Sequence, residues 1–116
     1  MKKALIVTLC IATLVILQNC GSSKKINKVK EPVVSFEKDV MPILQARCTP
    51  CHFPPDGRKK PLNTYDAVKG NIADIIARVK LPKTDNGFMP WKGKKPALSD
   101  TMINVLEQWQ KQNMPQ

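Results

Sequence analysis

The stretch Cys48-Thr49-Pro50-Cys51-His52 places two thiols three positions apart and an imidazole directly after the second. This spacing is the attachment signature of a c-type haem. Each thiol can add across one vinyl group of the porphyrin, and the adjacent imidazole can turn onto the iron. The sequence therefore predicts a haem c, bound covalently through Cys48 and Cys51, with His52 as an axial ligand of the iron. Pro50 is expected to shape the turn that presents His52.

Two other interpretations of this motif remain open. A Cys-Xaa-Pro-Cys pair can be a thioredoxin-like redox dithiol, but such a site expects alternating strands and helices, and nothing in the chain has that pattern. A structural zinc site requires four Cys or His ligands, whereas this region supplies three and no second pair follows it. The haem interpretation is favoured.

The N-terminal residues 1–19 have the layout of a secretory signal. Lys2 and Lys3 precede an apolar run from Ala4 to Leu17. That run is short for a membrane-spanning helix. The sequence therefore predicts export of the domain that follows.

The end of this run, Leu17-Gln18-Asn19-Cys20-Gly21, resembles a bacterial lipoprotein signal, in which the cysteine becomes the acylated first residue of the mature chain. Leu17 and Cys20 fit that pattern, whereas Asn19 stands where Gly, Ala or Ser is usual. Ordinary signal cleavage and an uncleaved anchor are the alternatives. All three place the domain outside the cytoplasm, in the periplasm or cell envelope, and the acylated form attaches it to a membrane.

Residues 20–33 contain several lysines and serines and too few apolar residues to form a core, so a flexible tether is expected there. The remainder, 34–116, is expected to be a single domain. A domain of that size has a marginal apolar core, and a covalently bound haem would supply the missing apolar mass.

The apolar positions of this domain follow helical spacing, and alternating strand patterns are absent, so the predicted class is all-α. Each expected helix has a polar residue at its start that can cap it. The expected helices run from Phe36 or Asp39 to Arg47 (cap Ser35 or Asp39), from Tyr65 to Lys69 (cap Thr64), from Asn71 to about Lys80, and onward from Ser99. Because proline is tolerated only in a first helical turn, Pro42 favours the later start of the first helix.

The loop Asp85–Gly93 is expected to supply the second axial ligand. His52 is the only histidine, so a second His cannot bind the same iron within one molecule. A methionine thioether is the natural alternative and raises the reduction potential. Met89 lies in this loop, while the other methionines lie in helices or near the termini. The alternatives are a five-coordinate iron with Met89 in the core, or a lysine ligand.

With these motifs in place, the domain resembles the small monohaem cytochromes c of class I, in bacterial periplasmic or lipid-anchored form. The resemblance is carried by Val40–Leu44 before the haem motif, Cys48–His52, Leu62–Val68, Phe88–Pro90, and Leu98-Ser99 leading to Trp109. It implies about three to five short helices around one covalently attached haem, with His on one side and Met on the other. Phe88, Trp91 and Tyr65 are candidate haem-packing side chains, with plain core positions as the other interpretation. Pro61 precedes Leu62, at a point where relatives commonly have a glycine-rich segment before the leucine.

The expected coordination points to a function. If protein atoms fill both axial positions, no substrate reaches the iron, so the site exchanges electrons but offers no place for bond chemistry. The sequence therefore predicts a one-electron carrier between redox partners of a respiratory chain, with no enzymatic activity and no small-molecule substrate. A gas sensor with an open iron position and a haem subunit of a larger redox enzyme are the alternatives.

The charge balance suggests the kind of partner. Lys2 and Lys3 account for two of the 19 basic residues, so the chain beyond the signal keeps 17 against nine acidic ones, a net charge of +8. Two basic clusters flank the haem motif and the Met loop: Arg58, Lys59 and Lys60, and Lys92, Lys94 and Lys95. They could steer docking to an acidic redox partner, or simply be solvated. Nucleic acid is a poor candidate, because the domain is exported and lacks a recognisable binding motif.

Overall fold

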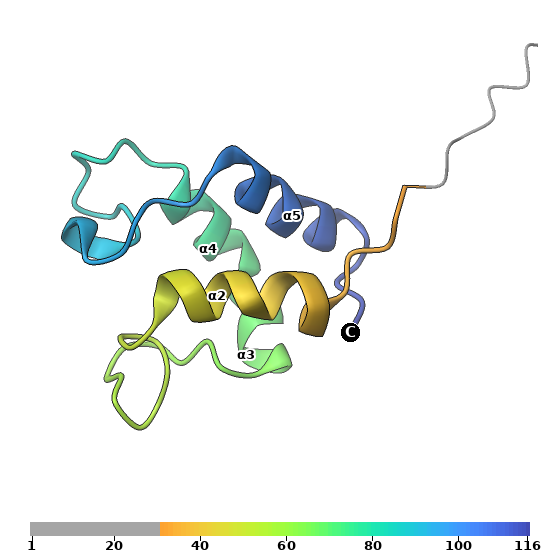
Figure 1. The fold of residues 1–116 in the computed structure, drawn as a ribbon, viewed down its shortest axis with the longest axis horizontal. Helices are drawn as coiled ribbons and strands as arrows, with labels where there is room; N and C mark the ends of the chain where they lie inside the picture. Colours follow the sequence, from red (N-terminus) through yellow and green to blue (C-terminus); the bar gives the residue numbers. More distant parts are fainter. Residues whose placement is uncertain (1–30) are drawn as a thin grey trace, which may run out of the picture. The chain divides into compact units, whose positions relative to one another are not determined.

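The computed structural model describes residues 31–116. The expected signal, Cys20 and most of the tether lie outside the described residues. In chain order the helical segments are η2 (Phe36–Val40), α2 (Met41–Cys48), α3 (Tyr65–Lys69), α4 (Ile72–Val79), η3 (Trp91–Gly93) and α5 (Asp100–Lys111). No strand occurs in this part of the chain, so the all-α class is confirmed (Figure 1). Among the same residues, none of the helices has the length and apolar character needed to span a membrane.

The first helical stretch begins at Phe36, the earlier of the two expected starts. The Ser35 hydroxyl accepts the backbone N–H of Lys38 at 3.5 Å, as expected for a cap. Pro42 does not delay the start, because the chain reaches it through a π-type turn, η2, in which N–H groups reach back five residues. Pro42 therefore lies in the first turn of a new stretch, α2, where a missing N–H is tolerated.

The later helices begin where the sequence predicts, with one difference at Asn71. The Thr64 hydroxyl caps α3 by accepting the N–H of Ala67 at 3.3 Å. Asn71 precedes α4 but makes no capping bond. The amide nitrogen of Asn71 instead donates to the Ala67 carbonyl at 2.6 Å, and its amide oxygen accepts a hydrogen bond from the Lys60 ammonium at 2.8 Å. Because these two bonds engage the side chain, it does not cap α4 as the sequence predicts.

The N-terminal cap of α5 allows a direct test of local stability. The Ser99 hydroxyl accepts the N–H of Met102 at 3.3 Å. We expect Ser99→Ala to lower the free energy of unfolding by about 1 kcal/mol, because one helix-end N–H loses its partner. Thr101→Ala, at an exposed position of the same first turn, is the control. Thermal unfolding followed by circular dichroism measures both, and equal losses would contradict the capping role.

The core forms where α5 packs against η2 and α4. Phe36 of η2, Tyr65 of α3 and Trp109 of α5 form an aromatic cluster with ring centroids 5.3 to 6.0 Å apart, in which Tyr65 packs edge-to-face against the other two rings. Trp109 and Leu106 of α5 have no exposed surface, whereas Met102 and Val105 of the same helix are partly buried. The main core consists of Phe36, Val40, Leu44, Leu62, Val68, Ile72, Ile75, Ile76, Val79, Leu106 and Trp109.

Different segments of the chain lie at the two ends of the domain. Residues 31–34 and the C terminus lie at one end of the long axis, while the end of α2 and the loop between α4 and α5 lie at the other (Figure 1). The first end is closed by Gln112, whose side chain accepts the Val34 N–H at 2.8 Å and donates to the Pro32 carbonyl at 3.1 Å. The chain therefore enters the domain at the end away from the haem motif.

Candidate haem-attachment site

The end of α2 forms a tight turn that carries the haem motif. Cys48 is the last residue of the helix, and the N–H of His52 donates to the Cys48 carbonyl at 3.1 Å. The N–H of Phe53 donates to the Pro50 carbonyl at 3.0 Å, which closes a second turn. These bonds hold the backbone from Cys48 to His52 in one compact coil.

His52 is held by a backbone carbonyl that the sequence analysis did not identify. Its Nδ1 lies 2.8 Å from the carbonyl oxygen of Lys60. A carbonyl oxygen can only accept, so Nδ1 carries the hydrogen, and in the neutral ring Nε2 then carries the free lone pair. Histidines that bind metal ions are usually oriented in this way, with the second ring nitrogen donating to a carbonyl or carboxylate. The residues present therefore fit an imidazole ligand to iron.

The loop that follows His52 folds back over the motif. The N–H of Lys59 donates to the Cys51 carbonyl at 3.2 Å, and the N–H of Leu62 donates to the His52 carbonyl at 2.8 Å. Leu62 is buried in the core and fixes the far end of the loop. The loop is thus tied to the backbone of the motif at two points, and this places the Lys60 carbonyl against the imidazole.

Gly57 is required at the closest approach of this loop. A Cβ at this position would overlap the carbonyl oxygens of Pro50 and Cys51, which are backbone atoms and cannot move independently. We expect Gly57→Ala to lower the free energy of unfolding by about 2 kcal/mol, because the loop must move off the motif. The same movement would weaken the bond between His52 and Lys60.

Gly70→Ala is the matched control for this substitution. The backbone of Gly70 is helical, and a Cβ there meets only the Asp66 carbonyl oxygen, at an ordinary 3.4 Å. Denaturant unfolding of both variants measures the difference. A Gly57→Ala protein as stable as the Gly70→Ala protein would show that the loop does not press against the motif.

The two thiols have different surroundings. Cys48 is partly buried and packs against the core, and burial raises the pKa of its thiol from 9.0 to about 11. Cys51 is exposed, and neither cysteine is in a disulfide. Within residues 31–116 no group of three or more His, Cys, Asp or Glu side chains is arranged to hold a metal ion. The described part of the chain therefore supplies no set of ligands for the zinc alternative.

Met89 lies in a loop that is attached to the end of α4. Its N–H donates to the Arg78 carbonyl at 3.3 Å, and the Arg78 guanidinium reaches the Gly87 carbonyl at 3.4 Å. The Met89 side chain is partly buried and packs against the same core cluster as Cys48. This loop and the C-terminal end of α2 also lie at the same end of the long axis (Figure 1). Axial pairing of Met89 with His52 stays a prediction.

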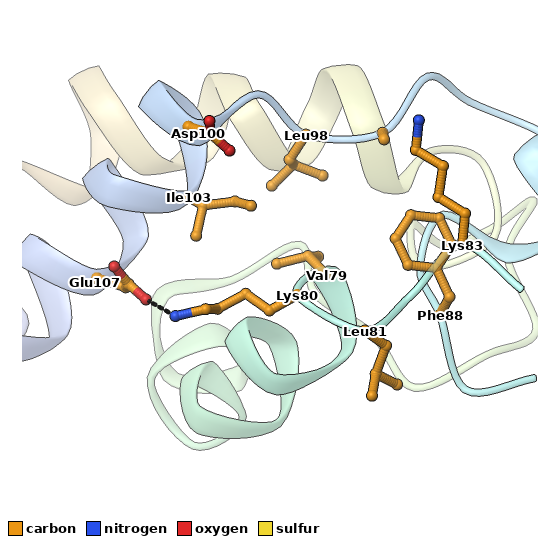
Figure 2. Close-up of a pocket in the computed structure, with 10 residues that line it drawn as sticks. Val79, Lys80, Leu81, Lys83, Phe88, Leu98, Asp100, Ile103 and Glu107 are labelled. Carbon is orange, nitrogen blue, oxygen red and sulfur yellow. Dashed lines mark hydrogen bonds and ion pairs between the residues drawn. The ribbon is translucent and has the colours of Figure 1, made fainter. Parts of the chain in front are cut away.

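A cavity of about 460 Å³ lies between α4, the loop that follows it and the start of α5 (Figure 2). Val79, Leu98 and Ile103 point toward one another in its interior, and Phe88 lies at one side. An ion pair of 2.6 Å joins Lys80 of α4 to Glu107 of α5 beside it. No residue of the haem motif lines this cavity, so it lies beside the Met loop rather than at the attachment turn.

The three candidate haem-packing residues have separate positions. Tyr65 is half-buried in the aromatic cluster, and its hydroxyl donates to the Met114 carbonyl at 2.7 Å. Phe88 is buried and lines the cavity. Trp91 is 46% exposed, so its interpretation as a plain core residue is wrong. The turn that carries it projects the ring to the surface instead.

The basic side chains expected at a docking surface are mostly exposed. Arg58, Lys59, Lys60, Lys92 and Lys94 are exposed, and Lys95 is half-buried. None of them forms an ion pair with another residue of 31–116. The two clusters differ in their other contacts, because the Lys60 ammonium donates to Asn71, whereas Lys92 and Lys94 lie over the ring of Trp91.

Comparison of the chain with protein-family models, curated proteins and solved structures gave no match. The functional interpretation therefore depends on the residues and their geometry. What the site offers chemically is two thiols on one turn and an imidazole whose Nε2 lone pair is available.

Proposed function

We propose that this protein is a one-electron carrier that acts outside the cytoplasm and binds a haem c through Cys48 and Cys51. The observation that carries the proposal is the bond from His52 Nδ1 to the Lys60 carbonyl, next to two free thiols in one turn. It leaves Nε2 as the ring nitrogen that can bind iron. A dithiol oxidoreductase needs a thiol with a lowered pKa, whereas burial raises the pKa of the Cys48 thiol to about 11.

When bound, the haem would supply a one-electron couple between ferric and ferrous iron. Cys48 and Cys51 would hold the haem covalently, and His52 would supply one ligand to its iron. Met89 would supply the second ligand, because its thioether is soft and its loop is attached to α4 next to the core. Two protein ligands would leave no position for a substrate, which favours electron transfer over catalysis.

The same proposal includes the location and the partners. Export by residues 1–19 and acylation at Cys20 would place the domain at a membrane of the cell envelope. The partners would be redox proteins with acidic surfaces, since the chain beyond residues 1–19 has 17 basic residues against nine acidic ones. Electrons would pass at an exposed edge of the haem.

An optical spectrum tests this function most directly. The exported protein is produced together with haem-attachment machinery, and spectra are recorded in the oxidised form, in the reduced form and with carbon monoxide. We expect a c-type reduced spectrum, a weak long-wavelength band from sulfur-ligated ferric haem, and no response to carbon monoxide. A response to the gas would favour the sensor alternative, and a colourless protein would overturn the proposal.

A further inference from the structure

Trp91 is an exposed aromatic side chain next to the candidate iron ligand. Within residues 31–116 only Trp91 and Val33 are exposed large hydrophobic residues, at 46% and 65%. Trp91 is two positions after Met89, and the intervening Pro90 is buried. The ring is therefore held at the surface by a fixed backbone. Tryptophan is among the residues most enriched at the energetic centres of protein interfaces.

Two lysines lie over this ring and lack acidic partners. The Lys92 ammonium is 4.6 Å from the ring centroid, and the Lys94 ammonium is 5.4 Å from it. Neither forms an ion pair with any residue of 31–116, and the sequence from 86 to 99 contains no Asp or Glu. The charges around Trp91 are thus free to pair with carboxylates of another molecule.

The backbone of η3 adopts an unfavourable conformation to make this arrangement. Lys92 has φ of 51° and ψ of 30°, a left-handed conformation that is costly for a residue with a Cβ. Gly93 follows with φ of 66°, and a Cβ there would meet nothing within 4 Å, so its backbone angle rather than packing requires glycine. Such conformations concentrate at functional surfaces.

We infer that Trp91, Lys92 and Lys94, here called the Trp91 patch, form the docking surface for an acidic redox protein whose contact face has carboxylates around an apolar centre. The inference rests on the proposed electron-carrier function and names its contact site. The lysines would pair with the carboxylates at the rim, while the indole ring would be buried at the centre. Trp91 lies two residues after Met89, the proposed second ligand, so a partner docked on the patch would be close to the iron.

The other basic cluster fits this role less well. Its lysine at position 60 is already bound to Asn71, and no exposed aromatic lies beside Arg58 or Lys59. η3 also lies at the end of the long axis away from residues 31–34, where the chain enters the domain (Figure 1).

Binding to a defined surface tests the inference. The probe is a gold surface with a mixed monolayer of carboxylate-terminated and phenyl-terminated thiols, and the bound mass of the full haem-loaded protein is followed by surface plasmon resonance. We expect the double variant Lys92→Gln/Lys94→Gln to bind about tenfold more weakly at low salt, where charges are little screened. The double variant Arg58→Gln/Lys59→Gln changes the net charge equally, and we expect less than about a threefold loss.

Trp91→Ser tests the apolar part of the surface. At about 0.5 M salt, where the lysine charges are screened, we expect this variant to bind about tenfold more weakly than the native protein. Val33→Ser removes the other exposed hydrophobic side chain and should bind like the native protein. The inference would be overturned if the two charge variants lost binding to the same extent, or if Trp91→Ser bound as well as the native protein.

The absorption spectrum of the same samples separates the two proposals. If the protein carries haem but all variants bind alike, the electron-carrier proposal stands and the proposed docking surface is contradicted. A colourless protein overturns both, because the inference names a contact site for electron transfer.

Discussion

Replacing both Cys48 and Cys51 by alanine is expected to yield an exported protein with no covalently bound haem. The two thiols are the only cysteines in residues 31–116, and both are free. Without them no thioether bond can form, and His52 and Met89 would hold the iron only through coordination bonds, which a denaturing wash breaks. The measurement is a haem stain of the denatured protein after electrophoresis, together with the intact mass. The native chain should keep the stain and the mass of one haem.

Thr49→Ala is the matched control for this double variant. Thr49 lies within the same turn, and its hydroxyl donates to the Gln45 carbonyl at 2.7 Å. Its loss should cost about 1 kcal/mol of stability and leave the haem attached. If the double cysteine variant retained the stain, or if the Thr49→Ala variant lost it as well, attachment through these two thiols would be contradicted.

Replacing Met89 by alanine is expected to leave the haem attached but to open one axial position of the iron. The ferric long-wavelength band from sulfur ligation should disappear, the reduced protein should bind carbon monoxide, and the reduction potential should fall. The spectra and a potentiometric titration measure these changes. Unchanged ligation in this variant would contradict the assignment of Met89.

Met41→Ala separates ligation from packing. Met41 and Met89 are both partly buried, and both pack against the same core cluster. Each substitution should therefore lower the free energy of unfolding by a similar amount, about 2 kcal/mol, through lost apolar contacts. Only Met89→Ala should change the spectrum. A Met41→Ala protein that binds carbon monoxide would indicate that general loosening of the core, rather than loss of a ligand, opens the iron.

The helices could be predicted from the sequence because their signals are local. Thr64 and Ser99 cap the helices that follow them, and the buried residues of α4 lie at helical spacing: Ile72, Ile75, Ile76 and Val79. Where a prediction failed, a side-chain contact outside the helix or an unexpected turn decided the outcome. Asn71 bonds to Lys60 and Ala67 instead of capping α4. Pro42 follows a π-type turn that no local pattern indicates.

The candidate haem motif can likewise be recognised in the sequence, because the proposed thioether attachment would require its residues to be close together in the chain. Its supporting contacts were not visible. The acceptor for His52 is the backbone carbonyl of Lys60, and every residue has such a carbonyl, so no residue type marks it. The need for glycine at position 57 also follows only from the fold, which brings the loop against the carbonyls of Pro50 and Cys51.

The sequence by itself determined the all-α class, most helix starts and the chemistry offered by Cys48, Cys51 and His52, since each depends on spacing within a few residues. The tertiary structure alone decided which nitrogen of His52 is free, which side chains are buried, and that Trp91 lies at the surface beneath two lysines. These features depend on contacts between segments far apart in the chain. Such contacts form only when the apolar faces of η2, α4 and α5 pack together and exclude water.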